Sequence, residues 1–354
     1  MDFDSNSNYR LHSSGISGKI LLWITDFLAN RCQKVRIGNS YSDSIPVLSG
    51  VIQGSVLGPT LFNIFVNNID TSIKFSYILK YADDLRIYLA STNSDSALKD
   101  LHFKLQHDID KIANWVSDSG MALNISKCFQ ASFGKSPTPR SYSISGSTIP
   151  NKSLFKDLGV LVSVPLSFNK DIDHIVSKAF IRLGLVRKIF HTRSPEAILR
   201  LFKAYVRPIL EYASIIWNPS AKTYKSKTER VQRRMCRMIP ALRQLPYSKQ
   251  LKHLRLYSLQ ARRQRYQLIT LFKFSRNLTD FDFYSLFEVR TTSKTRGHKL
   301  KIVPKFTRHK YRQNFFTNSS VHLWNKLTDE DINAPNITQF KKRIELLLQN
   351  ESIW

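Results

Sequence analysis

Cysteine is scarce in this chain, which holds three cysteines among 354 residues. Cys32, Cys128 and Cys236 are widely separated, and no Cys-x-x-Cys pair or Cys/His cluster occurs, so the sequence supports neither a zinc site nor a disulfide framework. No run approaches the roughly 18 apolar residues of a membrane span. The polar residues 1–9 lack the apolar core of a signal peptide. We therefore expect an intracellular protein that is not secreted and has no membrane partner.

Acidic residues are also in short supply. The chain carries 26 Asp and Glu against 54 Lys and Arg, a formal net charge of +28. The excess is concentrated in residues 187–273, which hold 21 basic and 3 acidic residues, whereas residues 1–186 hold 19 and 15. A concentrated basic block is typical of proteins that bind a phosphate backbone. The alternative is a basic surface that only keeps the protein soluble.

Apolar residues make up 42% of the chain and aromatic residues 12%, enough for packed cores in two domains, or three. Helical spacing and strand-like alternation succeed each other in the first half. This order favours an α+β fold rather than a regular βαβ winding. The predicted elements are helices over 16–28, from 59 to 69 and over 95–117, and strands within 32–38, 44–50, 75–90, 128–134 and 155–162.

The second half changes character after about residue 165. Apolar residues recur there at helical spacing over long stretches, and basic residues lie between them. The second half is therefore expected to be mostly helical and basic. The predicted helices cover residues 169–190, 195–217, 222–238, 258–275 and 337–349.

The segment YADDLRIY, residues 81–88, places Asp83 and Asp84 side by side among strand-like apolar residues. Aspartate is depleted in strands, and two unit charges about 4 Å apart repel by roughly 4 kcal/mol at an effective dielectric of 20. At a hairpin turn both carboxylates would approach one point. There Mg²⁺, which takes one or two carboxylates with water and phosphate oxygens, would offset the repulsion. The alternative is an exposed turn with two solvated aspartates.

Gly50, Gly54 and Gly58 mark a tight loop before the helix that is predicted to begin near Pro59. Glycine lets the backbone come close to a phosphate or a base, and the N-terminus of the following helix attracts anions. Gln53 offers hydrogen bonds to a nucleotide. Because glycine-rich turns before helices are common, an ordinary turn is the alternative.

Several segments occur in the order of one enzyme family's motifs. They read SGVIQGSVLGPTLFNIFVNNI, YADDLRIY, LNISKC and FKDLGVLV, followed by FKAYVRPILEYASIIWNP, ERVQRRMCRMI, HLWNKL and QFKKRIELLL. In this order the chain resembles the reverse transcriptases of non-LTR (LINE-type) retrotransposons of the jockey or CR1 type, over roughly residues 16–350. The resemblance implies an RNA-directed DNA polymerase that uses Mg²⁺ or Mn²⁺, an RNA template, a DNA primer and dNTPs. It also implies a ribonucleoprotein in the nucleus, the cytoplasm or both.

The resemblance implies roles for four residues near the predicted metal site. Asp83 and Asp84 match the palm carboxylates that hold the catalytic Mg²⁺, and Tyr81 lies beside the primer terminus. Lys127 matches the lysine suggested to protonate the departing pyrophosphate. For Lys127, an ordinary surface lysine is the alternative.

The resemblance also implies nucleic-acid contacts away from the metal site. Gln53 and Gly54 match the loop under the incoming nucleotide and the template. Leu158 and Gly159 match the turn that grips the primer, where a glycine lets the backbone approach the nucleic acid. The basic helices after residue 165 would be thumb and template-handling elements.

The implied architecture is a partial polymerase palm, an antiparallel sheet with helices but without fingers, followed by a mostly helical basic thumb and C-terminal region. The palm is expected to hold both aspartates. The expected division is an N-terminal remnant with the first palm helix over 1–35, the palm over 36–165, a thumb-like region over 166–220 and the basic C-terminal region over 221–354.

The start of the chain departs from the family pattern. A polymerase palm needs a third carboxylate from an earlier strand, followed by an aromatic residue that screens the sugar. Asp2-Phe3 is the candidate for this pair, with Asp2 as metal ligand, and the alternative alignment through Phe3-Asp4 leaves the ligand missing. Ile52 stands where the family normally has proline, a tolerable change. We therefore expect a 5′-truncated polymerase that is inactive or weak by itself.

Two interpretations from other classes remain open. The first is a non-catalytic RNA or DNA binder that uses the basic helical half, with little sequence preference and a steep salt dependence. The second is a pseudogene product that folds poorly and has no function. A cooperative melting transition would distinguish a folded protein from the latter.

Overall fold

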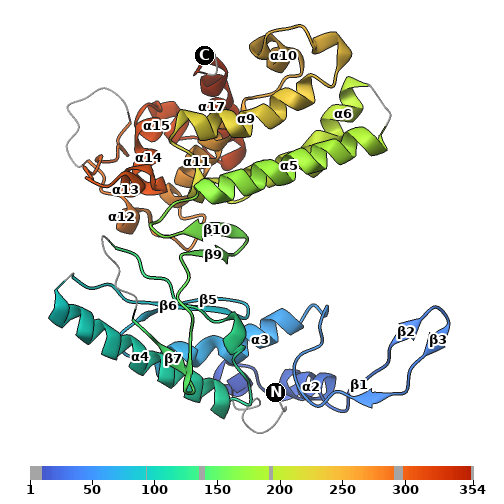
Figure 1. The fold of residues 1–354 in the computed structure, drawn as a ribbon, viewed down its shortest axis with the longest axis vertical. Helices are drawn as coiled ribbons and strands as arrows, with labels where there is room; N and C mark the ends of the chain where they lie inside the picture. Colours follow the sequence, from blue (N-terminus) through green and yellow to red (C-terminus); the bar gives the residue numbers. More distant parts are fainter. Residues whose placement is uncertain (1–9, 93, 135–139, 191–193, 291–297, 352–354) are drawn as a thin grey trace. The chain divides into compact units, whose positions relative to one another are not determined.

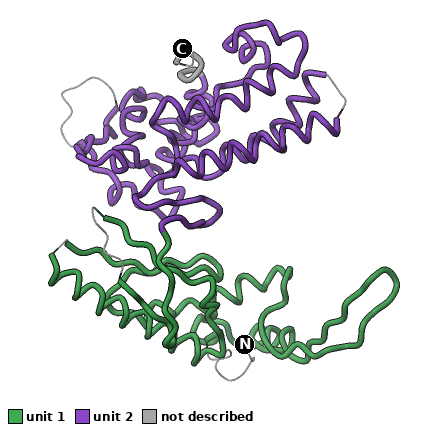
Figure 2. Tube along the Cα trace, in the orientation of Figure 1, with its two compact units in different colours: residues 1–152 green, residues 153–354 purple. Residues whose placement is uncertain are grey.

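The fold is given by a computed structural model (Figure 1). The chain divides into two compact units, residues 1–152 and residues 153–354 (Figure 2). Across the part of the chain that is described, no helix combines the length and the apolar character needed to cross a membrane. The structure describes residues 10–92, 94–134, 140–190, 194–290 and 298–351.

The first unit packs short two-stranded hairpins against helices. One small core joins α2 to α3, and two others lie between α4 and the hairpins beside it. Its elements are α2 (Gly18–Leu28), β1 (Cys32–Gln33), β2 (Arg36–Ile37), β3 (Ser40–Tyr41), β4 (Ile45–Pro46), α3 (Gly58–Val66), the 3₁₀ helix η1 (Asn67–Ser72), β5 (Tyr77–Tyr81), β6 (Asp84–Tyr88), α4 (Asp95–Asp118), the 3₁₀ turn η2 (Ile125–Lys127), β7 (Ser143–Ile144) and β8 (Ser147–Thr148).

The predicted helices and the central hairpin of the first unit are confirmed. Ser94 caps α4 by accepting a hydrogen bond from the Ala97 amide at 3.3 Å, and Ile109 and Ile112 are buried on its apolar face. Pro59 lies in the first turn of α3, where its missing N–H costs nothing. The β5–β6 hairpin occupies the segment that was predicted as strand, turn and strand.

Two strand predictions are wrong. Residues 128–134 form no strand, because they find no neighbouring strand to pair with and only Gln130 makes an isolated bridge, to Asn151. Residues 155–162 form a hairpin rather than one strand, because Leu158 and Gly159 take positive φ values of 41° and 88° and reverse the chain.

Among its described residues the second unit is mostly helical and contains one named hairpin, β9–β10, as the apolar spacing predicts. The α+β class is therefore confirmed, although every sheet among the described residues has only two strands. Its elements are β9 (Leu154–Asp157), β10 (Val160–Ser163), α5 (Asn169–Ile189), α6 (Pro195–Leu201), the π-helical segment Phe202–Val206, α7 (Arg207–Glu211), α8 (Ser214–Trp217), α9 (Lys222–Cys236), the 3₁₀ turn η4 (Pro240–Leu242), α10 (Tyr247–His253), α11 (Leu259–Ser275), α12 (Phe283–Leu286), α13 (Lys310–Asn314), α14 (Phe316–Ser319), α15 (Val321–Asn325), α16 (Asp329–Ile332) and α17 (Ile337–Glu351).

The helix predicted over 195–217 is interrupted. Pro208 has no amide hydrogen for the helical ladder, and the preceding residues take π-helical bonding, with the Arg207 amide donating to the Phe202 carbonyl. α7 ends at Glu211, and Ala213, the residue before α8, adopts a left-handed conformation with φ of 50°, so the two helices are not continuous. Helical spacing alone did not reveal this break.

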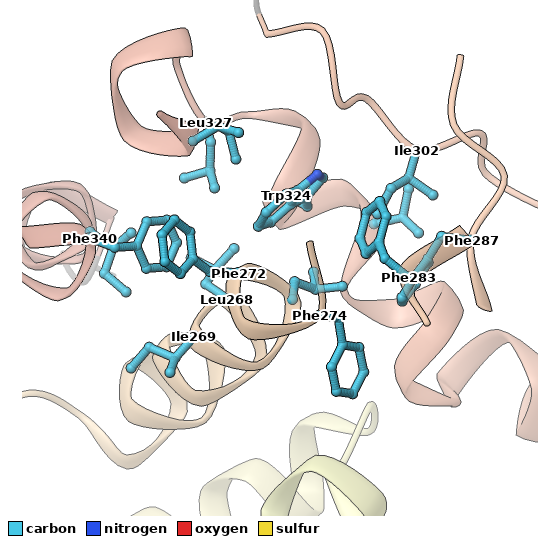
Figure 3. Packing of buried hydrophobic residues seen from close by; sticks show 14 of the residues in the cluster. Leu268, Ile269, Phe272, Phe274, Phe283, Phe287, Ile302, Trp324, Leu327 and Phe340 are labelled. Carbon is cyan, nitrogen blue, oxygen red and sulfur yellow. The ribbon is translucent and has the colours of Figure 1, made fainter. Parts of the chain in front are cut away.

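Aromatic side chains build the core around α11 and α17 (Figure 3). Phe272 of α11 stacks on Phe340 of α17 with ring centroids 4.1 Å apart. Trp324 is fully buried in the same cluster, and its indole N–H donates to the Leu300 carbonyl at 2.8 Å. A second core lies between α5 and α9. The basic block thus lies on helices whose apolar faces are packed.

Candidate active site

The β5–β6 hairpin is labelled in Figure 1. Both predicted metal ligands lie where its two strands meet. Tyr81 at the end of β5 pairs with Asp84 at the start of β6, so Ala82 and Asp83 form a two-residue turn. Ala82 adopts a left-handed backbone conformation with φ of 50°, which tight hairpin turns commonly need. Both aspartates are exposed. The two carboxylates therefore lie at a hairpin tip and not inside a continuous strand.

The register of the hairpin separates an apolar face from a polar one. Ile78 and Ile87 form a cross-strand pair and pack on α4. Because side chains alternate along a strand, Tyr81 and Asp84 lie on the opposite face. Arg86 shares that face, with its guanidinium 3.7 Å from the Asp84 carboxylate. The Tyr81 side chain is 64% exposed, so this face offers a phenol, a carboxylate and a guanidinium to solvent.

Asp108 of α4 holds the chain just before β5. Its buried carboxylate accepts hydrogen bonds from the amides of Lys74, Phe75 and Ser76 at 3.0, 2.9 and 2.7 Å, and from the Ser76 hydroxyl at 2.5 Å. Burial by itself raises the pKa of Asp108. The hydrogen bonds outweigh burial, with the largest effect from the Ser76 hydroxyl, and lower the pKa to about 2. The contact sets where the hairpin begins. The sequence analysis did not predict this contact. The position of Asp108, four residues before Ile112 on the apolar face of the helix, could have indicated a buried carboxylate with hydrogen-bond partners.

Asp108→Asn is expected to lower the free energy of unfolding of the first unit by about 2 kcal/mol, because a neutral amide replaces a carboxylate that accepts several hydrogen bonds. The folded pKa of about 2 lies below the ordinary value of 3.8, so the stabilisation is present above that value and disappears as the pH falls toward 2. Urea unfolding of both proteins at neutral and at acidic pH measures it. The exposed Asp110→Asn variant is the control. A difference that does not shrink in acid would contradict this assignment.

The loop before α3 is shaped by its own side chains and backbone. The Ser55 hydroxyl donates to the Ile52 carbonyl at 2.7 Å and accepts a hydrogen bond from the Gly58 amide at 2.9 Å. A Cβ atom on Gly58 would lie 2.8 Å from that carbonyl, so the position requires glycine. Gln53 and Gly54 lie at the exposed tip, where Gly54 has a φ of 81°. The loop therefore presents both predicted nucleotide contacts to solvent.

The remaining predicted site residues belong to elements other than the β5–β6 hairpin. Lys127 ends the 3₁₀ turn η2, is exposed, and forms no ion pair with either aspartate among the described residues. Leu158 and Gly159 form the turn between β9 and β10, which belongs to the second unit. The structure thus joins the two aspartates and Tyr81 on one hairpin, and places the predicted primer-gripping turn in the other unit.

The donor set at the hairpin tip suits a hard divalent cation. Two adjacent exposed carboxylates fit Mg²⁺, which keeps water and phosphate oxygens in its other positions. No group of three or more His, Cys, Asp or Glu side chains gathers within the part of the chain that the structure describes. Asp2, the predicted third ligand, lies outside the described residues, as do Phe3 and Asp4.

Comparisons with known proteins agree with the motif order. The model of the family "Reverse transcriptase (RNA-dependent DNA polymerase)" matches residues 3–162. The RNA-directed DNA polymerase from mobile element jockey of Drosophila melanogaster is 24% identical over 232 residues, which are 62% of this chain and 25% of the relative. The jockey polymerase of Drosophila funebris is 26% identical over 63% of this chain and 25% of its own length.

A third relative extends the group beyond jockey. The probable RNA-directed DNA polymerase from transposon BS of Drosophila melanogaster is 25% identical over 61% of this chain and 25% of the relative. The chain thus spans about a quarter of the length of these curated relatives. Residues 3–162 are therefore a reverse transcriptase domain, and the chain is a homologue of the RNA-directed DNA polymerases of non-LTR retrotransposons.

Proposed function

We propose that the chain is part of an RNA-directed DNA polymerase that adds a deoxynucleotide to a primer 3′-hydroxyl, with Asp83 and Asp84 holding Mg²⁺ or Mn²⁺. The observation that carries the proposal is the pair of adjacent carboxylates at the exposed tip of the β5–β6 hairpin of a reverse transcriptase domain. When bound, such ions help to activate the attacking hydroxyl and neutralise the leaving pyrophosphate. Asp2 is the proposed third ligand.

The other proposed roles follow from where the side chains lie. Tyr81 shares a strand face with Asp84, so its ring supports the primer terminus beside the metal ligands. Gln53 and Gly54 contact the incoming nucleotide and the template from the exposed tip of their loop. Lys127, which forms no described ion pair with the aspartates, donates a proton to the departing pyrophosphate.

The finer architecture is part of the same proposal. The antiparallel hairpin with its helices forms a partial palm over residues 36–165, and the helices over 166–220 and 221–354 act as thumb and C-terminal region. The turn of Leu158 and Gly159 grips the primer. The partners are an RNA template, a DNA primer and dNTPs, within a ribonucleoprotein of the nucleus, the cytoplasm or both. Activity of this chain alone is weak, because Asp2-Phe3 reproduces the first carboxylate motif incompletely.

Primer extension on an RNA template tests the proposal directly. The purified chain is incubated with a DNA primer, dNTPs and Mg²⁺ or Mn²⁺, and samples are followed over hours. Slow incorporation that EDTA abolishes is the expected result. Rapid extension of long products would contradict the expected weakness, and incorporation that is independent of divalent metal would contradict the two-aspartate site.

Nucleic-acid binding without catalysis is a second proposed function, which the charge distribution of the second unit favours. Residues 212–279 contain a single acidic residue, Glu229. It is buried, and burial raises the pKa of its carboxyl group. Its carboxyl group accepts hydrogen bonds from the Tyr247 hydroxyl and the Leu259 amide. The surface of this segment therefore presents cations and no carboxylate.

Contacts within the unit separate two sets of cations. Lys227 and Arg262 form ion pairs with carboxylates of α5 and α7 and are neutralised. Arg230 and Arg234 of α9 and Arg237, which follows its last residue, are here named the basic stripe; all three are exposed and form no ion pair with a described carboxylate. Residues three and four apart share one helix face. The basic stripe is therefore the surface proposed to contact a phosphate backbone.

A further inference from the structure

We propose that Tyr212 is a positioning residue that holds the Leu158–Gly159 turn in the conformation that contacts the sugar-phosphate backbone of the primer. The Tyr212 hydroxyl donates a hydrogen bond to the Leu158 carbonyl at 2.7 Å, across 54 residues of sequence. This inference rests on the proposed primer contact of that turn. All three residues belong to the second unit.

The turn needs an external support. Asp157 and Val160 form the last pair of the β9–β10 ladder, so the two residues between them have no ladder partner. Leu158 has a φ of 41°, which costs a residue with a side chain about 1 kcal/mol or more. A hydrogen bond to its carbonyl offsets that cost and selects this conformation over others.

The Tyr212 ring also covers the glycine of the turn. A Cβ atom on Gly159 would lie 3.3 Å from Cε1 of the ring, tighter than ordinary contact, and Gly159 has a φ of 88°. The glycine therefore serves two requirements, the left-handed conformation and the close approach of the tyrosine. The ring lies against one side of the turn, while the Leu158 side chain is 41% exposed.

Tyr212 is itself fixed by the break between α7 and α8. Its amide donates to the Pro208 carbonyl at 3.0 Å, and its carbonyl accepts from the indole N–H of Trp217 at 2.7 Å. Trp217 is buried against Val160 of β10. The same tryptophan thus contacts the hairpin and orients the residue that supports its turn.

The hairpin is held at a second point. Asp171, near the start of α5, is buried and accepts a hydrogen bond from the Leu161 amide at 2.8 Å. The hairpin is therefore held at its turn by Tyr212 and on β10 by Trp217 and Asp171. A nucleic acid that binds at the turn meets a backbone that is already ordered, so binding does not bear the entropy cost of ordering it.

Tyr212→Phe tests the inference, because it removes the hydroxyl and keeps the ring. Tyr205→Phe is the matched control, since Tyr205 is an equally exposed tyrosine of the same unit. We expect amide hydrogen exchange over residues 157–160 to become about fivefold faster in Tyr212→Phe, the change that follows from losing one net hydrogen bond. We expect the Kd for an RNA–DNA primer–template duplex to rise by a similar factor, with the melting temperature equal to that of the control.

The outcomes separate the inference from the function on which it rests. Unchanged exchange over residues 157–160 in Tyr212→Phe would overturn the positioning role. Faster exchange with unchanged duplex affinity would overturn the primer contact of the turn itself. An equal loss of duplex affinity in Tyr212→Phe and in Tyr205→Phe would overturn the specific role of Tyr212.

Discussion

Asp83→Asn is expected to reduce the metal-dependent incorporation of nucleotides by about a thousandfold, to background. Asparagine suits a tight turn as well as aspartate does, so the fold of the hairpin is retained. What is lost is the negative charge at the tip and with it a ligand of the cation. Removing a preorganised electrostatic group from an active site commonly reduces the rate by about 10² to 10³.

A metal titration makes this prediction independent of activity. Mn²⁺ binding, followed by water proton relaxation, is expected to weaken at least about tenfold in Asp83→Asn, because one of two carboxylates is gone. Asp43→Asn is the matched control, since Asp43 is an exposed aspartate between β3 and β4. Equal Mn²⁺ binding by the wild type and Asp83→Asn would show that the hairpin tip is not the metal site.

Replacing the three arginines of the basic stripe by glutamine is expected to weaken RNA and DNA binding by about a hundredfold at low salt. The estimate takes about 1 kcal/mol for each lost contact to a phosphate. The slope of log K against log salt should become shallower by about three, because three fewer counterions are released. The loss should be the same for different sequences, since phosphate contacts carry no sequence information.

The control variant loses the same number of positive charges, but from the first unit instead of the basic stripe. Lys19, Lys99 and Lys111 are exposed lysines of α2 and α4, and their triple replacement by glutamine removes the same three charges from the first unit. Fluorescence anisotropy with a labelled oligonucleotide over a salt series measures both variants. If the two triple variants lose the same affinity, binding depends on net charge alone and the basic stripe has no special part.

The hairpin that carries the aspartates was predictable because its determinants are local. Ile78, Leu85 and Ile87 lie on one face of two short strands around two turn residues, and the whole hairpin spans the 12 residues from Tyr77 to Tyr88 within the predicted segment 75–90. Helix α4 was predictable for the same reason, since its apolar residues repeat at helical spacing from a serine cap. In both cases neighbours in the sequence are also neighbours in space.

The errors arose where a distant partner or a single backbone conformation decides the structure. Alternation over 128–134 resembles a strand, but a strand exists only when another strand pairs with it. The spacing over 195–217 is helical, but Pro208 and Ala213 interrupt the ladder. At Leu158 the left-handed conformation is supported by Tyr212, 54 residues away, which no local pattern indicates.

The sequence by itself determined the chemical character of this protein: the paired aspartates among strand residues, the order of the reverse transcriptase motifs and the basic excess in residues 187–273. Only the tertiary structure decided which charges are used internally and which are exposed. Asp108 is buried against amides more than thirty residues away, Glu229 is buried beneath the basic surface, and Lys227 is paired, whereas Arg234 is exposed. The physical reason is that desolvation and hydrogen bonding depend on the neighbours in space, which composition and periodicity do not specify.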